Sequence, residues 1–364
     1  MLLYPPPRVG NGSYCGLRSK SGDLIGHGLI NRKSEIAFRI LGGPEDRDFA
    51  ALLRARISAA HDLRTQVLRL HESTDAARIV HGEADGLSGL VVDRYASVLS
   101  VMVYSLGYVR NGEAVEAALR RLPDVERVVF HADPRSAELE GFNIPDEPGP
   151  LLVDVVENTV KFQVDLAGKH KTGLFLDQRD NRFLVARHAH GRTVLDLCTN
   201  AGGFAIHAKK RGEARQVTGV DLDEDVLGRA RKNAKLNGVS IELVHADIFD
   251  WLREAKTSAR KFEVVVLDPH KLVTGRQELH PGLRKYHDMN RLAFEVVGKN
   301  GLFFTYSCSG AVSESAFVEV VAEAAAAAGR KARVLRYLGA APDHPVALDF
   351  PEGRYLKGLM IQVD

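Results

Sequence analysis

From Thr193 onward the chain alternates short apolar segments with amphipathic ones, and this alternation limits the fold more than any other feature of the sequence. The expected strands are TVLDL, VTGVD, IELV, FEVVVLD, GLFFTYS, RVLRYL and YLKGLMIQV. The expected helices cover residues 203–211, 225–236, 248–256, 286–297 and 314–328. Alternating strands and helices form a doubly wound, mostly parallel sheet, because each parallel pair needs a crossover connection. The pattern therefore predicts an α/β domain whose ligand lies at the carboxyl ends of the strands.

Three smaller segments precede this domain, which we assign to residues 181–364. Residues 1–45 are rich in glycine and turn residues and hold one clear strand, SEIAFRIL, which predicts a small β module. Residues 46–148 predict a compact α/β unit with the strands SVLSVMVYSL and RVVFHA. Residues 149–180 begin in the Pro/Gly-rich NIPDEPGP and alternate around Glu157, which predicts a β-hairpin.

Residues 46–71 open the second segment as an amphipathic helix or helix pair, because apolar residues recur there at near-helical spacing. A basic helix face is more often hydrated surface than a binding site. The arginines expected on this solvent face are Arg54, Arg56, Arg64 and Arg69.

The composition is that of an ordinary globular protein, with 45% hydrophobic and 26% charged residues. A net charge of only +2 means that a nucleic-acid partner would need a local basic face. No apolar run approaches the roughly 18 residues of a membrane-spanning helix, and prolines interrupt the N-terminal MLLYPPPRVG where a secretion signal would be apolar. Cys15, Cys198 and Cys308 show no CxxC spacing, which argues against a zinc site or a disulfide framework and favours the cytoplasm.

Carboxylates stand at the ends of the first three strands of the domain. Asp196 precedes the turn CTNAGGF, whose paired glycines, Gly202 and Gly203, let a ligand approach the backbone. Asp221 ends the second strand 19 residues after Gly202, where nucleotide-binding folds hold a ribose. Asp247 follows the third strand and is placed to accept from an adenine amino group, although aspartate is also a common helix cap. Because the turn is neither GxGxxG nor a Walker loop, S-adenosylmethionine is favoured over a dinucleotide, and a dehydrogenase is the weaker alternative.

The fifth strand ends at Cys308, and the fourth ends at Asp268 in VVVLDPHK. A lone cysteine is most often a small core hydrophobe. In methyltransferases, however, the fourth strand end faces the transferred methyl group, which makes Asp268 a candidate for contacting the acceptor base. C5 of a pyrimidine is a poor nucleophile, whereas a thiolate that adds to C6 turns C5 into an enamine carbon that can attack. The position of Cys308 therefore predicts a nucleophile for C5 methylation.

The sequence resembles the bacterial 23S ribosomal RNA cytosine-C5 methyltransferases of the PUA-containing large-subunit type over residues 20–364. The motifs that carry the resemblance are GEADGLSGLVVDRY, HKTGLFLDQRDNR, DLCTNAGGF, KYHDMN, TYSCSG, DHPV and PEGRYLKGL. The resemblance implies a class I methyltransferase fold with a seven-stranded sheet. It also implies a middle RNA-recognition domain, a truncated PUA-like module, S-adenosylmethionine as cofactor and 23S ribosomal RNA as substrate.

The resemblance further implies roles for individual residues. Cys308 and Asp268 would be catalytic, with Asp268 at the N3/N4 edge of a flipped cytosine. The implied cofactor pocket comprises Phe175, Asp177, Gln178, Arg179, Asp196, Thr199, Asn200, Gly202, Gly203, Phe204, Asp221, Asp247, Asp268 and Pro269. The implied contacts with the target nucleotide come from Lys271, Tyr286, Asp288, Asn290 and His344. A basic cluster expected to contact phosphates comprises Lys169, His170, Lys171, Arg179 and Arg182.

Two other functions stay open from the sequence. An N-methyltransferase acting on an RNA base would need no cysteine at this strand end. An RNA-binding protein that keeps the cofactor fold without turnover is consistent with the shortened N-terminal module and with DPHK at 268–271, where the family has DPPK. The sequence identifies neither the target nucleotide nor the base that removes the C5 proton, and it leaves open whether the chain forms a homodimer.

Overall fold

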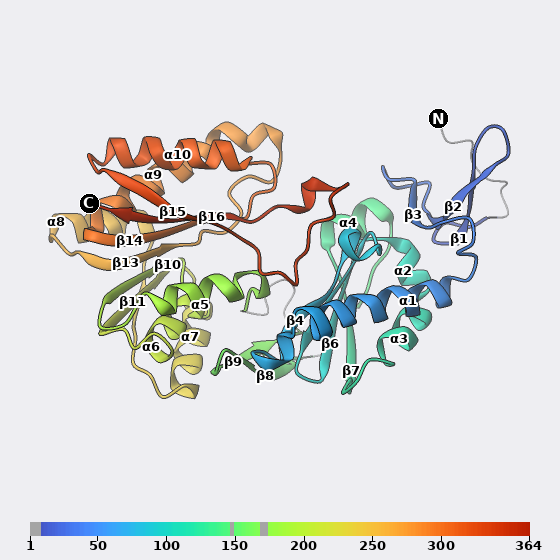
Figure 1. The fold of residues 1–364 in the computed structure, drawn as a ribbon, viewed down its shortest axis with the longest axis horizontal. Coiled ribbons are helices and arrows are strands. Elements are labelled where there is room, and N and C mark those ends of the chain that lie inside the picture. The colour runs from blue at the N-terminus through green and yellow to red at the C-terminus, as the bar shows by residue number, and fades with distance from the viewer. Residues whose placement is uncertain (1–8, 146–148, 168–173) are drawn as a thin grey trace. The chain divides into compact units, whose positions relative to one another are not determined.

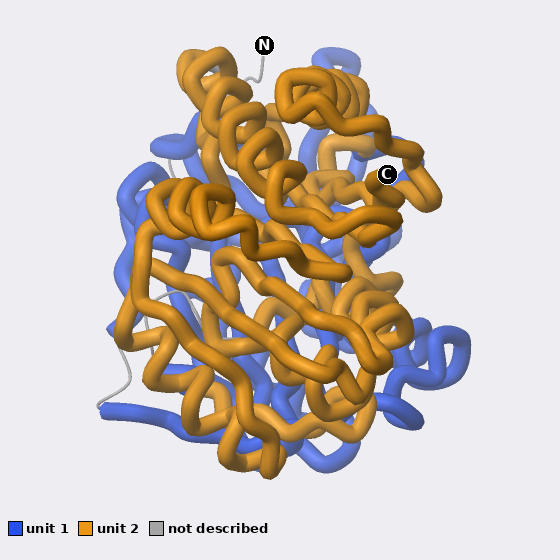
Figure 2. Tube along the Cα trace, turned by 90° about the vertical axis from the view of Figure 1, so that its left-hand side faces the viewer, with its two compact units in different colours: residues 1–155, 165–172, 343–350 blue, residues 156–164, 173–342, 351–364 orange. Residues whose placement is uncertain are grey.

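The computed structural model describes residues 9–145, 149–167 and 174–364, and the chain divides into two compact units (Figure 2). Unit 1 contains residues 1–155, 165–172 and 343–350. Unit 2 contains residues 156–164, 173–342 and 351–364. Each unit has an apolar core of its own.

A seven-stranded sheet forms the centre of unit 2 (Figure 1). Its strands are β10 (Thr193–Leu197), β11 (Gln216–Asp221), β12 (Glu242–His245), β13 (Phe262–Leu267), β14 (Val297–Ser307), β15 (Ala332–Gly339) and β16 (Lys357–Val363). Their order is β12-β11-β10-β13-β14-β16-β15, with β16 antiparallel to both neighbours and the other pairs parallel. The order reverses between β10 and β13, the switch point where such sheets bind ligands. The predicted doubly wound α/β class is confirmed.

Helices cover both faces of this sheet. They are α5 (Arg179–Arg187), α6 (Gly203–Lys210), α7 (Glu224–Leu236), α8 (Ile248–Thr257), α9 (Leu279–Val296) and α10 (Glu314–Ala327). Figure 1 shows α8, α9 and α10 on one face and α5, α6 and α7 on the other. Side chains of β14 alternate between two cores, since Phe303 belongs to the core that contains Trp251 and Phe304 belongs to the core that contains Phe204. Strands buried on both faces read as continuous apolar runs, which is why the sequence locates them.

Unit 1 contains two sheets. β1 (Tyr14–Arg18), β2 (Leu24–Ile30) and β3 (Phe38–Gly42) form an antiparallel sheet in that order. The second sheet is β4 (Ala76–His81), β5 (Leu90–Tyr95), β6 (Val98–Val103) and β7 (Arg127–Ala132), in which β6 and β7 pair in parallel. The helices are α1 (Phe49–Asp62), α2 (Leu106–Arg110), α3 (Gly112–Leu119) and α4 (Pro134–Glu140).

The hairpin predicted around Glu157 is present as β8 (Leu152–Glu157) and β9 (Val160–Asp165). Its two strands pair with each other and with no strand of the larger sheets in the described part of the chain. None of the described helices combines the length and the apolar character that crossing a lipid bilayer requires.

The helix predicted over residues 46–71 changes its geometry partway. α1 ends at Asp62, and a π-helical turn follows over Leu63–Val67. Arg64 in this turn is buried and donates two hydrogen bonds to the Asp85 carboxylate, at 2.6 and 2.8 Å. The prediction that Arg64 lies on the solvent face is wrong, because the wider turn shifts the helical period and a buried carboxylate pairs with the guanidinium.

Candidate active site at the carboxyl ends of the strands

The turn after β10 is shaped by backbone conformations that few residues adopt. Cys198, Asn200 and Gly202 have φ angles of 61°, 51° and 84°, in the left-handed region. At Gly202 a Cβ atom would also come within 2.9 Å of the Ile206 side chain, so only glycine fits there without strain. α6 begins directly afterwards, at Gly203. The paired-glycine turn therefore brings the start of α6 to the end of β10.

Asp196 is the buried carboxylate beside this turn. It accepts hydrogen bonds from Thr199 Oγ1 at 2.6 Å and from the Ala205 amide at 3.0 Å, both through Oδ2. Its Oδ1 atom is buried and has no hydrogen-bond partner in the described part of the chain. Burial raises the pKa of Asp196 to about 7. An unsatisfied buried acceptor is costly, so Oδ1 has room for a further donor, and the contact of Asp196 with the cofactor stays a prediction.

Two further aspartates lie at the ends of β11 and β12. Asp221 accepts hydrogen bonds from the amides of Asn200 at 2.9 Å and Asp223 at 3.0 Å, so it links the glycine turn to the loop before α7. Asp247 is the N-cap of α8 and accepts from the Phe249 amide at 2.8 Å. The helix-cap interpretation of Asp247 thus holds, and its contact with adenine stays a prediction.

Cys308 and Asp268 meet where two neighbouring parallel strands end. Cys308 directly follows β14, and Asp268 directly follows β13. The Cys308 thiol lies 3.9 Å from the carbonyl oxygen of Pro269. Burial and the charges of Asp268 and Asp177 raise the pKa of Cys308 to about 12. The structure therefore brings the predicted nucleophile next to the residue predicted to contact the acceptor base, with the thiol protonated near neutral pH.

The surroundings of the Asp268 carboxyl raise its pKa far above the usual range of an aspartate. Burial, together with the charges of Asp177 and Asp196, raises its pKa to about 8, against an opposing hydrogen bond from the Gln178 side chain. A carboxyl that stays protonated at pH 7 can donate a hydrogen bond or a proton to a ligand. This shift is of the kind that a general acid needs, and the contact of Asp268 with a target base stays a prediction.

Cys308 projects toward this site because its neighbours in the chain are held on the other face. Ser307 and Ser309 are fully buried, and their hydroxyls contact the Tyr286 hydroxyl at 2.9 and 3.1 Å. Tyr286 is itself fully buried, and the Asn290 amide donates to its carbonyl oxygen at 2.7 Å. This burial favours a supporting role for Tyr286 and Asn290, and their contact with a target nucleotide stays a prediction.

Cys198 also follows a strand of the sheet, but its surroundings differ from those of Cys308. Burial raises the pKa of Cys198 well above its usual value, and nearby carboxylates raise it further. These carboxylates belong to Asp221, Asp268, Asp196 and Asp247. The charge of Lys271, by contrast, lowers the pKa of Cys308. The two strand-end thiols therefore differ in the charges that act on them.

Two arginines of the predicted basic cluster are buried. Arg182 forms two hydrogen bonds of 2.7 Å with the carboxylate of Glu157, which is fully buried as well. Arg179 is also buried. The expectation that these arginines reach phosphates is wrong, because a buried ion pair keeps Arg182 inside. The lysines and the histidine at 169–171 lie outside the described residues.

The remaining predicted residues lie in different places. Phe175, Lys271 and Asp288 are exposed, and Phe175 retains 45% of its accessible surface. His344 belongs to unit 1, where its ring centroid lies 5.3 Å from that of His81. The structure thus gathers the strand-end residues in unit 2, and a contact of His344 with the target nucleotide stays a prediction.

Three residues with no predicted role belong to this part of the molecule. The Tyr306 hydroxyl is buried without a partner in the described residues, and its ring stacks on Phe204 at 5.6 Å. Glu157 anchors Arg182, and Lys357 is buried at the start of β16. Tyr306 and Lys357 could have been identified from the sequence, because each is a polar residue inside an apolar strand segment. The segments are GLFFTYS and YLKGLMIQV.

Residues 143–349 match the family model of S-adenosylmethionine-dependent methyltransferases. The chain is 36% identical over 366 residues to ribosomal RNA large subunit methyltransferase I of Aeromonas salmonicida, covering 97% of this chain and 91% of that protein. It is 33% identical over 365 residues to the protein of the same name from Klebsiella pneumoniae strain 342, covering 97% and 90%.

Two solved structures resemble the fold. SMU.776, a methyltransferase in complex with SAH, matches with a TM-score of 0.82 at 20% identity, over 98% of this chain and 93% of that one. A SAM-dependent methyltransferase from Streptococcus mutans matches with a TM-score of 0.80 at 19% identity, over 99% and 93%. The likeness confirms the predicted class I methyltransferase fold.

Proposed function

The chain belongs to the S-adenosylmethionine-dependent methyltransferases named ribosomal RNA large subunit methyltransferase I, and from that premise we propose that it methylates C5 of a cytosine in 23S ribosomal RNA through a covalent adduct of Cys308. S-adenosylmethionine is the cofactor of this family and supplies an electrophilic methyl group. The observation that carries the proposal is the position of Cys308 next to Asp268 at two neighbouring strand ends.

The chemistry of cytosine explains why this pair matters. Exocyclic nitrogens can attack a sulfonium methyl group directly, so their methylation needs no thiol. C5 becomes nucleophilic only after the Cys308 sulfur bonds to C6, which moves the electrons of the C5–C6 double bond onto C5 and the ring. C5 then forms a bond to the methyl carbon, and the bond between that carbon and the cofactor sulfur breaks. Loss of the C5 proton to water and departure of the sulfur from C6 restore the double bond and the thiolate.

Asp268 supports the first of these steps. Because its pKa is raised to about 8, the carboxyl carries a proton at neutral pH and can donate it toward N3 of the cytosine. Negative charge reaches N3 when sulfur adds to C6, so a donor at that position stabilises the adduct. The unsatisfied Oδ1 of Asp196 and the carboxylate of Asp221 are assigned to the ammonium and the ribose of the cofactor.

The other parts of the chain take roles that follow from this reaction. We assign RNA recognition to residues 46–148, and we assign residues 1–45 as a truncated PUA-like module. Residues 149–180 then cap the cofactor, and residues 181–364 carry out catalysis. His344 and the exposed Lys271 and Asp288 are assigned to the target nucleotide. Free thiols at all three cysteines support action in the reducing cytoplasm.

The product of methyl transfer tests the proposal. The protein is incubated with deproteinised 23S ribosomal RNA and cofactor labelled in the methyl group, and the RNA is digested to nucleosides. We expect the label in 5-methylcytidine. Label in an N-methylated nucleoside would contradict C5 chemistry, and cofactor binding without any transfer to RNA would point to a binding protein instead.

A further inference from the structure

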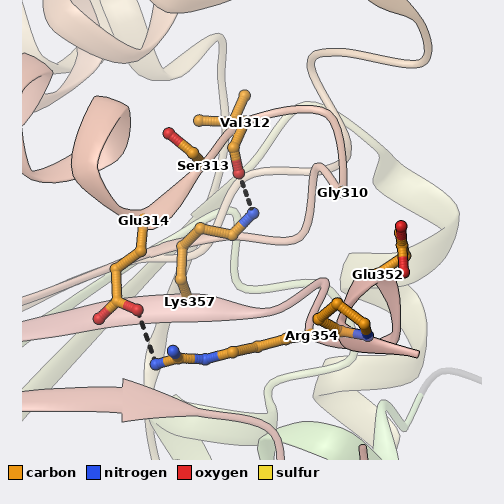
Figure 3. Close-up of a pocket in the computed structure, with 8 residues that line it drawn as sticks. Gly310, Val312, Ser313, Glu314, Glu352, Arg354 and Lys357 are labelled. Carbon is orange, nitrogen blue, oxygen red and sulfur yellow. Dashed lines mark hydrogen bonds and ion pairs between the residues drawn. The ribbon is translucent and has the colours of Figure 1, made fainter. Parts of the chain in front are cut away.

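Lys357 is a buried cation close to the proposed nucleophile. It is the first residue of β16 and only 3% exposed. Among the described residues no ion pair neutralises it, because Glu314, which borders the same cavity of about 500 Å³, is paired with Arg354 at 2.7 Å (Figure 3). Burying an ammonium without a carboxylate partner is costly. Another group is therefore needed to compensate its charge.

The Lys357 ammonium fastens the chain segment that follows Cys308. Its Nζ atom donates hydrogen bonds to the carbonyl oxygens of Ser309 at 2.7 Å and Val312 at 2.5 Å. Figure 3 shows the second of these contacts, with the lysine side chain reaching to Val312. Ser309 is the residue directly after Cys308, so the two hydrogen bonds fix the backbone that carries the thiol.

Lys357 reaches this segment from the face opposite to the thiol. Residues paired across antiparallel strands project to the same face, and Lys357 is paired with Ser307. Ser307 is turned toward Tyr286 on α9, whereas Cys308 packs with the core that contains Phe304 on the other face. Lys357 therefore does not touch the reacting atoms and acts through the backbone and through its charge.

The charges of Lys357 and Cys308 act on each other. Burial lowers the pKa of Lys357 to about 8, and the Cys308 thiolate is the first charge that raises it again. Because a Coulomb interaction is mutual, the ammonium favours ionisation of the thiol by the same free energy. This effect opposes the carboxylates of Asp268 and Asp177, which disfavour the thiolate.

We propose that Lys357 is a positioning residue that holds residues 308–312 in place and supplies the buried counter-charge of the Cys308 thiolate. The use of that thiolate in methyl transfer rests on the proposed function, whereas the ionisation of the thiol does not. During addition to C6 the negative charge passes from sulfur to the pyrimidine, and the ammonium keeps its three protons throughout.

Alkylation of Cys308 by iodoacetamide tests this role, because only the thiolate reacts. The rate is followed through the mass of the Cys308 peptide between pH 6 and pH 10. Lys357→Met removes the charge and both donors, whereas Lys357→Gln keeps an amide with two N–H donors and removes only the charge. We expect both variants to react about tenfold more slowly at pH 7.5, which corresponds to a rise of about one unit in the pKa of Cys308.

Arg336→Met is the matched control, because it removes an exposed cation from β15, the strand that pairs with β16. Its alkylation rate should stay within about twofold of the wild-type rate, as expected for an exposed, screened charge. Circular dichroism of each variant verifies that it is folded.

Two results would overturn the proposal. Wild-type alkylation rates in both folded Lys357 variants would show that the lysine does not influence the thiol. A slow Lys357→Met variant beside a wild-type rate in Lys357→Gln would contradict the counter-charge. Neither result depends on the RNA product, so a failure to form 5-methylcytidine would overturn the proposed function separately.

Discussion

Replacing Cys308 with alanine is expected to lower methyl transfer to RNA by at least about 10³-fold, because C5 has no other route to an attacking carbon. The loss should appear in kcat, whereas binding of S-adenosylmethionine, measured by equilibrium dialysis, should change little. The side chain packs at the edge of a core cluster and not at its centre, so the variant should keep its fold.

Cys15→Ala is the control for this substitution. Cys15 is a half-buried thiol in β1 of unit 1 and belongs to none of the strand ends that form the proposed site. We expect this variant to transfer methyl groups at the wild-type rate. Retained transfer by Cys308→Ala would return Cys308 to the role of a core hydrophobe and would move the chemistry to a nitrogen atom.

Asp268→Asn is expected to lower kcat by about 10²–10⁴-fold, the usual contribution of a general acid. Asparagine keeps the size of the side chain and can still donate a hydrogen bond, but it has no acidic proton to give. Asp250→Asn, at an exposed position of α8 that pairs with Arg253, is the control and should keep full activity.

The pH dependence of this variant provides a second readout. The wild-type rate should rise with pH as Cys308 ionises and level off above about pH 8, because the loss of the Asp268 proton then offsets the further ionisation of the thiol. The rate of Asp268→Asn should not level off there and should continue to rise with the ionisation of Cys308. At pH 9, where wild-type Asp268 is charged and opposes the thiolate, Cys308 should be alkylated faster in the variant than in the wild type. A variant with wild-type activity and an unchanged pH profile would contradict the assignment of Asp268 as the acid.

The sequence predicted the sheet well because its strands are buried on both faces. Segments such as TVLDL and FEVVVLD have no polar interruption, so their ends, and the aspartates behind them, could be placed to within about a residue. The same reasoning placed Cys308 behind β14 and next to the residue that follows β13. The carboxyl ends of parallel strands lie at one edge of the sheet regardless of the loop conformations. The prediction of the site depends on that rule.

The sequence could not show which contacts orient the side chain of Cys308 toward the site. The contacts of Ser307 and Ser309 with Tyr286 join positions more than 20 residues apart in the chain, and no local pattern specifies them. The same limit applies to Arg182, whose partner Glu157 lies on a hairpin 25 residues earlier. Each of these groups is polar and buried, and its position depends on a partner that only the folded chain supplies.

The predicted helix boundaries are wrong at two places, the start of α9 and the end of α1. α9 begins at Leu279, seven residues before the predicted start, because Pro281 lies in its first turn, where no amide needs an intrahelical acceptor. The π-helical turn at Leu63–Val67 has no sequence signature of its own and is set by packing around Arg64.

Trapping of the covalent intermediate tests the central claim most directly. In a 23S ribosomal RNA transcript made with 5-fluorocytidine, C5 carries fluorine and has no proton to lose after methyl transfer, so the sulfur cannot leave C6. We predict a protein–RNA complex that survives denaturing electrophoresis, requires S-adenosylmethionine, and maps by mass spectrometry to the peptide containing Cys308. A transcript that is methylated in its cytidine form but gives no such complex in its fluorinated form, or a complex that maps to Cys198, would contradict the account.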